Sequence, residues 1–536
     1  MRINLLILAL TAFVLGPSPA KAEELLPPNL PVEQVIDRYV DAQLQEAGLQ
    51  PARPAGDANF IRRLTLDLAG RIPTLEETRI FLGASQAGKR VELVEHLMNA
   101  AAFVRHQATE FDTMLMNGTR GSVRPYLLAA LAENRSWDRI YRDLMLPDDN
   151  DTKQNAASEF LRQRVRDLDK LTAEVSSIFF GVNVSCARCH DHPLVADWKQ
   201  DHFFGMKSFF SRTYESGGRL AERETGLVKF KTTKGVERQA RLMFLTGAVV
   251  ETETMKESPG GEARKTGKKN LSKTSPPPAP PKFSARAELV KLSLQPGQRD
   301  FFARSVVNRI WHRFFGYGLV MPLDQMHSEN APSHPDLLDW LARDLVEHQY
   351  DLRRLMRGIV LSSTYARDSR WDKGTAPRPS LFAVARVRPL TPMQLAVSLR
   401  LAVADPLSLP ATLKPEDLER RLQRLESSAG GLARFFEQPG DDFQVGVSEA
   451  LLFSNGAAIE RDLMTTTSGR LLNRLQQLKN EEAIELAVRT ILCRPRREEE
   501  RTLLGDYLKQ RNDRPAEARR QMVWALLTSA EFRFNY

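Results

Sequence analysis

Cysteine is scarce in this chain: only three occur among 536 residues, too few for a disulfide scaffold. The most apolar stretch, Ile3 to Gly16, is shorter than the roughly 20 residues that a membrane-spanning helix needs. The sequence also has no G-x-S-x-G elbow, no glycine-rich phosphate loop and no H-E-x-x-H helix. These absences predict a mature chain without a transmembrane segment, and they give no support to hydrolase chemistry by a familiar motif.

The N-terminus has the three parts of an export signal. Arg2 supplies a positive charge, the apolar stretch follows, and Ala20-Lys21-Ala22 is a small-x-small cleavage site. No cysteine stands at that site for lipid attachment. We therefore expect residues 1–22 to be a signal peptide, removed as the protein reaches the periplasm, the cell envelope or the extracellular space.

The charge balance is moderately basic, with 76 Lys and Arg against 67 Asp and Glu and a formal net charge of +9. Loss of Arg2 and Lys21 with the signal peptide would lower that charge by two. No array of arginines and aromatic residues indicates a nucleic-acid groove, so nucleic acid is not an expected partner. An acidic glycan or an anionic protein, such as a redox partner, is compatible with the charge.

The length of the chain predicts at least two domains. Residues 31–215 show the three-four apolar spacing of amphipathic helices, for example over Val32 to Ala47. Residues 285–536 show the same spacing, for example over Phe301 to Phe315. The predicted fold class is therefore mainly α, with two helical domains.

Two short segments interrupt the helical pattern. Within 225–250, Val228 and Phe230 alternate with lysines before a turn at Lys234-Gly235, and Ala240 to Val250 is then rich in Leu, Phe and Val as a second arm. This pattern predicts a small β-hairpin. Within 251–284, proline, lysine and glycine replace the large apolar residues, so this segment cannot bury a core. We expect it to be a disordered linker between the two helical domains.

Several helix starts carry capping residues. Thr74 to Glu77 and Thr391 to Gln394 both have the capping-box pattern, in which the first residue and the residue three positions on exchange hydrogen bonds. Ser333 is the expected N-cap of a helix over Leu337 to Glu347.

Reactive side chains are concentrated in Val184 to Pro193. Cys186 and Cys189 lie three positions apart and His190 follows directly, which is the C-x-x-C-H pattern of haem attachment. Two thiols one helical turn apart can each form a thioether to one porphyrin edge, and the next imidazole can bind the iron. The pattern predicts haem c bound by Cys186, Cys189 and His190.

Residues downstream of the motif leave the ligand set open. The candidates for a sixth haem ligand are His192, His202 and Met206, of which the last two could share a helix face. In an oxidising compartment, Cys186 and Cys189 could instead form a plain disulfide.

A metal ion is a third interpretation of the same segment. The two cysteines, with one or two of His190, His192 and His202, could bind zinc or a similar divalent ion. In a fourth interpretation, Asp191-His192 and Asp201-His202 form a mononuclear site by themselves, because each carboxylate could orient the imidazole beside it.

The other histidines and the third cysteine are predicted to be structural. A lone histidine is more often structural than a ligand, which applies to four of the six, whereas His334 stands at a helix start and His312 lies beside Trp311 and Phe314 in the sequence. The six are His96, His106, His312, His327, His334 and His348. Cys493 has apolar neighbours and is expected to be a buried, inert thiol.

Four stretches give the chain a family resemblance: Phe60 to Glu77, Cys186 to Pro193, Phe302 to Val320 and Pro332 to Ala342. On these stretches it resembles the secreted cytochrome-like proteins of planctomycetes, built from two domains of unknown function, fifteen-forty-nine and then fifteen-fifty-three. The resemblance implies a cytochrome-like character but no settled activity. The cysteine pair that many relatives carry at and just beyond Phe436 to Asp441 is missing here.

The leading hypothesis is an exported c-type cytochrome-like protein that transfers electrons. The alternative is a non-redox envelope protein whose C-x-x-C-H region is a disulfide or metal site, with a role linked to polysaccharide processing. A third hypothesis is a metal-dependent enzyme centred on His190, His192, Asp201 and His202.

Overall fold

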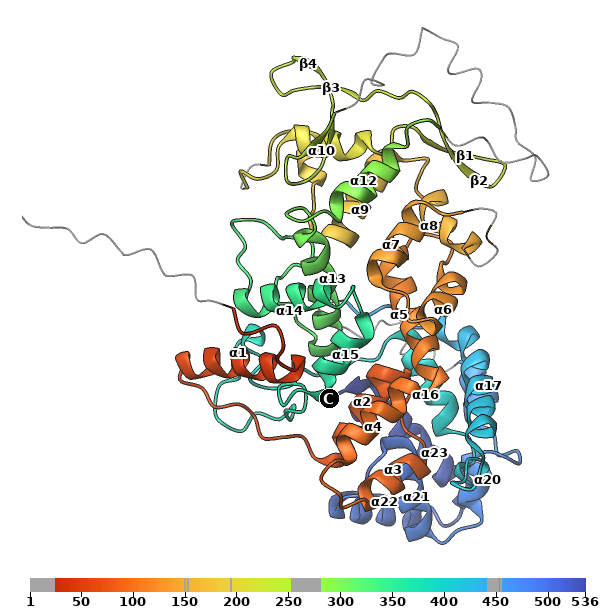
Figure 1. Cartoon of the computed structure of the whole chain (residues 1–536). Helices are drawn as coiled ribbons and strands as arrows, with labels where there is room; N and C mark the ends of the chain where they lie inside the picture. The colour runs from red at the N-terminus through yellow and green to blue at the C-terminus, as the bar shows by residue number, and fades with distance from the viewer. Residues whose placement is uncertain are drawn as a thin grey trace, which may run out of the picture.

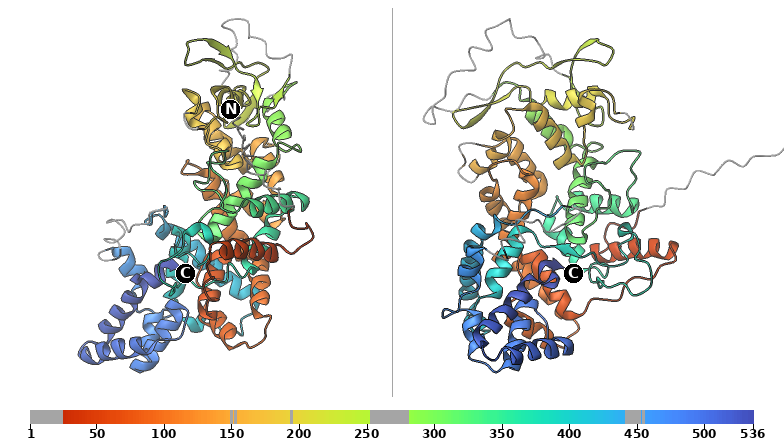
Figure 2. Two further views of the ribbon diagram at one scale, coloured as in Figure 1. Left: turned by 90° about the vertical axis from the view of Figure 1, so that its left-hand side faces the viewer. Right: turned by 180° about the vertical axis from the view of Figure 1, so that it is seen from behind.

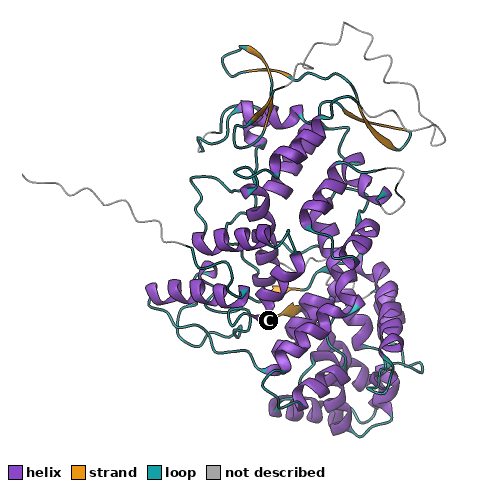
Figure 3. Cartoon of the chain, viewed as in Figure 1, coloured by secondary structure: helices purple, strands orange, loops and turns teal. Residues whose placement is uncertain are grey.

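The computed structural model describes residues 25–148, 151, 154–192, 195–251, 281–440, 453 and 456–536. The predicted signal peptide over 1–22 lies outside the described residues, as does all but the two ends of the predicted linker. The described part is mainly α-helical with only small two-stranded antiparallel sheets, which confirms the predicted fold class (Figure 3). None of its helices is long and apolar enough to cross a membrane.

The first part of the chain is a succession of short helices. Their bounds are α1 (Val32–Glu46), α2 (Asp57–Ala69), α3 (Leu75–Gly83), α4 (Lys89–Asn99), α5 (Ala101–Met116), α6 (Arg124–Ala132), α7 (Trp137–Met145), η1 (Asn155–Ser158), α8 (Glu159–Arg162), α9 (Leu168–Phe180), η2 (Ser185–Arg188) and α10 (Gln200–Ser208). In α1 the buried side chains keep the predicted three-four spacing, as at Val32, Val35, Ile36 and Val40.

Three hairpins follow at one end of the molecule (Figure 1). They pair β1 (Thr213–Ser216) with β2 (Arg219–Glu222), β3 (Lys229–Lys231) with β4 (Glu237–Gln239), and β5 (Leu242–Met243) with β6 (Val249–Val250). The β3–β4 hairpin confirms the alternating signal: Phe230 is buried and stacks on Phe204 with ring centroids 4.2 Å apart. The segment expected to be its long second arm instead forms β5–β6. The first hairpin was missed, although Gly217-Gly218 supplies its turn with φ values of 61° and 79°.

Helices resume after the undescribed segment. Their bounds, with two short strands, are α12 (Ala285–Ser293), α13 (Asp300–Phe315), α14 (Pro335–Glu347), α15 (Leu352–Leu361), η3 (Pro379–Leu381), β7 (Arg388–Pro389), α16 (Pro392–Ala402), η4 (Pro406–Ser408), α17 (Pro415–Ala433), α19 (Ala457–Leu463), α20 (Leu471–Gln476), α21 (Asn480–Leu492), α22 (Glu498–Gln510), α23 (Pro515–Thr528), α24 (Ala530–Arg533) and β8 (Phe534–Asn535).

The predicted caps have mixed outcomes. Thr74 and Thr391 both form the predicted capping box. The N-cap predicted at Ser333 is wrong, because α14 begins at Pro335 and the residue at its N-cap is His334. Proline has a backbone angle suited to the first helical position and needs no donor there, so Pro335 determines where the helix starts.

Helices from both sides of residues 252–280 share one hydrophobic core. Trp137 on α7 lies with its ring centroid 5.8 Å from that of Phe179 on α9 and 6.2 Å from that of Phe302 on α13. Tyr141 contacts the same Phe302 ring at 4.9 Å. Helix α1 likewise packs against α14 and α15 (Figure 1). The helices before and after the predicted linker therefore share one hydrophobic core. The predicted domain boundaries stay a prediction.

A second buried apolar cluster joins the C-terminal helices to α2. It contains side chains from Leu390 to Phe532 together with Leu66 and Ile72. Figure 2 shows the C-terminal helices beside the first helices of the chain, at the end opposite the hairpins. Helix α2 therefore contacts both clusters, since Leu64 and Leu68 belong to the first.

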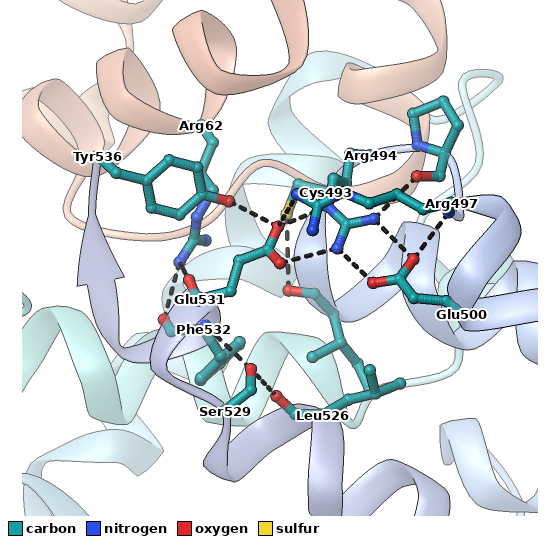
Figure 4. A network of polar contacts seen from close by, with 12 residues as sticks. Arg62, Cys493, Arg494, Arg497, Glu500, Leu526, Ser529, Glu531, Phe532 and Tyr536 are labelled. Atoms are coloured by element: carbon teal, nitrogen blue, oxygen red, sulfur yellow. Dashed lines mark hydrogen bonds and ion pairs between the residues drawn. The ribbon is translucent and has the colours of Figure 1, made fainter. Parts of the chain in front are cut away.

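A polar network fastens the C-terminus to α2 (Figure 4). The buried Arg62 donates through Nη2 to the carbonyl oxygens of Glu531, Phe532 and Phe534 at 3.1, 2.8 and 3.2 Å. Arg494 forms ion pairs with Glu500 and Glu531, each at 2.5 Å. These contacts determine where β8 lies.

Cys493 lies beside this network and is fully buried, as predicted. Burial raises the pKa of its thiol to about 11. The thiol is therefore protonated and unreactive at neutral pH, because the thiolate is the nucleophile.

Arg71, a buried residue of the loop between α2 and α3, forms an ion pair with the partly buried Glu77 in the first turn of α3. Arg71 donates to both carboxylate oxygens of Glu77 at 2.7 and 2.8 Å, and the Thr74 N–H donates to one of them at 2.7 Å. Burial alone would raise the pKa of Glu77, but the charge and hydrogen bonds of Arg71 overcome it and hold the pKa at about 2.

Glu77→Gln should lower the free energy of unfolding by about 3–5 kcal/mol, because Arg71 would stay buried without its counter-charge. Urea unfolding measures the loss. Glu76→Gln is the matched control, since its partner Arg79 is exposed and the change should have little effect. Equal losses in the two variants would contradict the prediction.

The same pair should make stability depend on pH in the acid range. Because the pKa of Glu77 is lower in the folded chain than its ordinary 4.5, the pair contributes fully above about pH 4.5 and is lost as the pH falls toward 2. The stability difference between the wild type and Glu77→Gln should shrink over this window in acid titrations. A difference that stays constant would show that the charge of Glu77 is not responsible.

Candidate functional site

The C-x-x-C-H segment lies on the surface directly after α9. Gly181 ends that helix with a φ of 67°, and the short η2 turn then includes Cys186 and leads into Cys189. In a turn of this kind, side chains three positions apart lie on the same side. Both cysteines are accordingly exposed and not disulfide-bonded, while Ala187 between them is fully buried.

His190 follows the two thiols and is also exposed. Its Nδ1 lies 2.7 Å from the backbone carbonyl oxygen of Asp191. A carbonyl oxygen can only accept a hydrogen bond, so Nδ1 is the protonated nitrogen and Nε2 keeps its lone pair. In this tautomer of the neutral imidazole, Nε2 can bind a metal ion or a haem iron.

Gln200, at the start of α10, holds this segment in place. Its side-chain amide donates to the carbonyl oxygen of Cys189 at 3.2 Å and accepts from the Thr233 N–H at 3.3 Å. Its own N–H donates to the Asp191 carboxylate at 2.9 Å. The motif, α10 and the β3–β4 hairpin are thereby connected. Sequence reasoning missed Gln200, because no local pattern distinguishes it from any other helix-start glutamine.

His202 and Met206 have structural environments. His202 Nδ1 accepts from the Lys199 N–H at 3.1 Å, and the ring meets that of Trp198 edge-on at 5.8 Å. Burial lowers the pKa of His202, so the ring is neutral and its proton is on Nε2. Met206 is fully buried in the core. In this arrangement neither side chain offers a free lone pair beside His190.

The carboxylates of Asp191 and Asp201 contact groups other than the histidines that follow them in the sequence. Asp191 accepts from the Gln200 N–H, as described above, and Asp201 forms an ion pair with Arg238 on β4 at 3.2 Å. His192 is half-buried, and its N–H donates to the carbonyl oxygen of Trp198 at 2.8 Å. Nowhere in the described residues do three His, Cys, Asp or Glu side chains come together as a metal-binding group. The zinc and mononuclear-metal hypotheses stay predictions.

The segment is also fixed against the second half of the chain. The Asp197 carboxylate accepts from the Ser328 N–H at 2.8 Å and from its hydroxyl at 3.0 Å, and Trp198 packs on Phe301 with ring centroids 6.0 Å apart. A cavity of about 360 Å³ lies beside this contact. His327 lines it with a buried Nδ1 that has no hydrogen-bond partner. Nothing in the sequence around His327 indicated that it lies near this segment.

Two known protein families match the chain. Residues 35–215 match PSCyt2, a protein of unknown function (DUF1549), and residues 285–423 match PSD1, a protein of unknown function (DUF1553). The chain belongs to the family built from these two domains in this order. The predicted resemblance is confirmed. No curated protein and no solved structure matches the chain. Since neither domain of this family has a known function, an activity has to be argued from the site.

In protein purified reduced and without haem, two thiols should react quickly with Ellman's reagent. Cys186 and Cys189 are exposed, whereas Cys493 is buried with a raised pKa and should react only after denaturation. The Cys493→Ala variant should keep both fast thiols and lose only the thiol that becomes reactive on denaturation. Fast reaction of all three thiols, or of none, would contradict this placement of the cysteines.

Proposed function

We propose that this chain is an exported redox protein that holds haem c covalently through Cys186 and Cys189, with His190 as the iron ligand. The observation that carries the proposal is the surface turn itself. It presents two unpaired thiols and an imidazole whose Nε2 is free, within five residues.

The donor set of this turn fits the group. Exposed thiols are accessible to an attachment enzyme, and the hydrogen bond from His190 Nδ1 to a backbone carbonyl is typical of imidazoles that bind a metal through Nε2. When bound, a haem would supply one-electron chemistry. Gln200 would keep the Cys189 carbonyl in place, and the contact of Asp197 with Ser328 would fasten the segment to the second half of the chain.

His190 is the only ligand that the proposal takes from this segment. His202 uses Nδ1 as an acceptor for the Lys199 N–H and carries its proton on Nε2, and Met206 belongs to the core. Recruiting either residue would cost a hydrogen bond or expose a buried apolar side chain.

The deciding test is a pyridine haemochrome spectrum of the full chain, produced in a host with the cytochrome c maturation system. The wild type should give a c-type spectrum at about one haem per chain, because both thioether-forming thiols are present. The Cys186→Ala, Cys189→Ala double variant should give none. Cys493→Ala is the matched control and should keep the haem, because that thiol is buried elsewhere.

Absence of haem from the wild type, in a host that matures a known cytochrome, would overturn the proposal. Elemental analysis and a thiol count on the same protein would then separate the alternatives. One equivalent of zinc would favour the metal site, and loss of the two fast thiols without a metal would favour the disulfide. Either result would favour a non-redox binding or structural role at the cell envelope.

A further inference from the structure

A separate cavity of about 420 Å³ lies where α2, α5 and α13 meet the β7–β8 ladder near the C-terminus. Its volume falls within the usual range for small-molecule sites. None of the residues around the C-x-x-C-H motif lines it. Its lining combines charged groups with an apolar wall that includes Phe111, Met114, Ile310, Phe314, Leu323 and Pro389.

Asp67 stands at one side of this cavity with its carboxylate already engaged. Arg388 donates to both carboxylate oxygens at 2.7 and 3.0 Å, the Tyr365 hydroxyl donates at 2.8 Å, and the Asn535 amide donates at 2.9 Å. Arg388 and Asp67 therefore form an ion pair, and Asp67 acts on Arg313 only through its charge at longer range.

Two further guanidiniums line the cavity and form no ion pair with any described residue. Arg309 donates to the carbonyl oxygen of Ser177 at 2.6 Å, and its Nε is buried without a partner. Arg313 donates to the side-chain oxygen of Gln107 and lies over the ring of Phe111 at 5.3 Å. Among the described residues, no carboxylate comes within ion-pair distance of either arginine.

The nearest acidic and basic groups do not correct this imbalance. Burial raises the pKa of Glu110, while the charge of Arg313 opposes this shift. Even with Glu110 ionised, the four arginines that line the cavity outnumber its two carboxylates, Asp67 and Glu110. Burial and the charge of Arg313 lower the pKa of His106 to about 3, so this ring is neutral. Burial lowers the pKa of Arg309 to about 10, which still leaves it charged at neutral pH. The cavity thus has an excess of positive charge in an environment where an unpaired charge is costly.

Asn535 adds an unsatisfied acceptor. Its amide nitrogen must face Asp67, because a carboxylate can only accept, and this orients Oδ1. That oxygen is buried and has no hydrogen-bond partner, and the residue is only 3 % exposed. A ligand with a hydroxyl group would satisfy it.

We propose that this cavity binds a small hydroxylated organic anion, a carboxylate or sulfate ester of about monosaccharide size. Arg309 and Arg313 would pair with the anionic group, Asn535 would accept from a hydroxyl, and the apolar wall would contact the body of the molecule. The proposal is independent of haem attachment, because the two sites share no residue.

Calorimetric titration of the full chain tests the proposal with D-glucuronate as the probe. D-glucose is the neutral control, and inorganic sulfate tests the anion alone. Glucuronate should bind with one site per chain, and glucose should bind at least about tenfold more weakly. Sulfate should compete with glucuronate, because both need the same guanidiniums.

Variants locate the binding. Arg309→Gln and Arg313→Gln should each weaken glucuronate binding by about tenfold or more. Arg511→Gln is the matched control, because Arg511 is exposed at the end of α22 and should leave binding unchanged. Arg386 is also exposed but lines the cavity, so Arg386→Glu should fold normally and still weaken binding several-fold.

Two results would overturn the proposal. One is the absence of saturable binding of both glucuronate and sulfate by the folded wild type up to about 10 mM. The other is glucuronate binding that is unchanged in Arg386→Glu and in whichever of Arg309→Gln and Arg313→Gln keeps the wild-type circular dichroism.

Discussion

The carboxylate of Asp67 joins parts of the chain that are far apart in sequence. It accepts hydrogen bonds from Tyr365, Arg388 and Asn535, so it connects α2 with the end of α15, with β7 and with the last residues of the chain. Charge-assisted bonds of this kind are strong in a buried environment, and an unsatisfied member is costly. Neighbouring Arg62 and Arg63 extend the connection by donating to C-terminal and loop carbonyl oxygens. The path of β8 depends on this set of contacts, and so does one wall of the cavity between α2, α5, α13 and the β7–β8 ladder.

The two candidate sites differ in how the fold supports them. The C-x-x-C-H turn is at the surface, and hydrogen bonds from Gln200 to the backbone hold it while its thiols stay accessible. The cavity proposed as an anion site is instead assembled from side chains of α2, α5, α13 and the β7–β8 ladder. A surface turn suits a group that is attached covalently after folding. A cavity lined by guanidiniums that form no ion pair with a described residue suits a small ligand that enters and leaves.

Local features were predictable because they depend on neighbouring residues. The apolar spacing of α1, the capping boxes at Thr74 and Thr391 and the β3–β4 hairpin were all predicted from periods and short patterns. The errors were local as well. Ser333 was predicted as the N-cap of α14, whereas the helix begins at Pro335 with His334 as its N-cap. The Gly217-Gly218 turn was overlooked. The cavity was not predictable, because no sequence pattern around His106 or Arg313 indicates contact with residues hundreds of positions away.

The sequence by itself determined the helical class, the family and the spacing of Cys186, Cys189 and His190, because each follows from residues close together along the chain. The tertiary structure alone decided which nitrogen of His190 is free, that His202 Nδ1 accepts the Lys199 N–H, and that Met206 lies in the core. It also decided that Arg309 and Arg313 face one cavity and form no ion pair with a carboxylate among the described residues. The physical reason is that tautomers, burial and charge balance depend on groups brought together by folding, and spacing along the chain does not specify those neighbours.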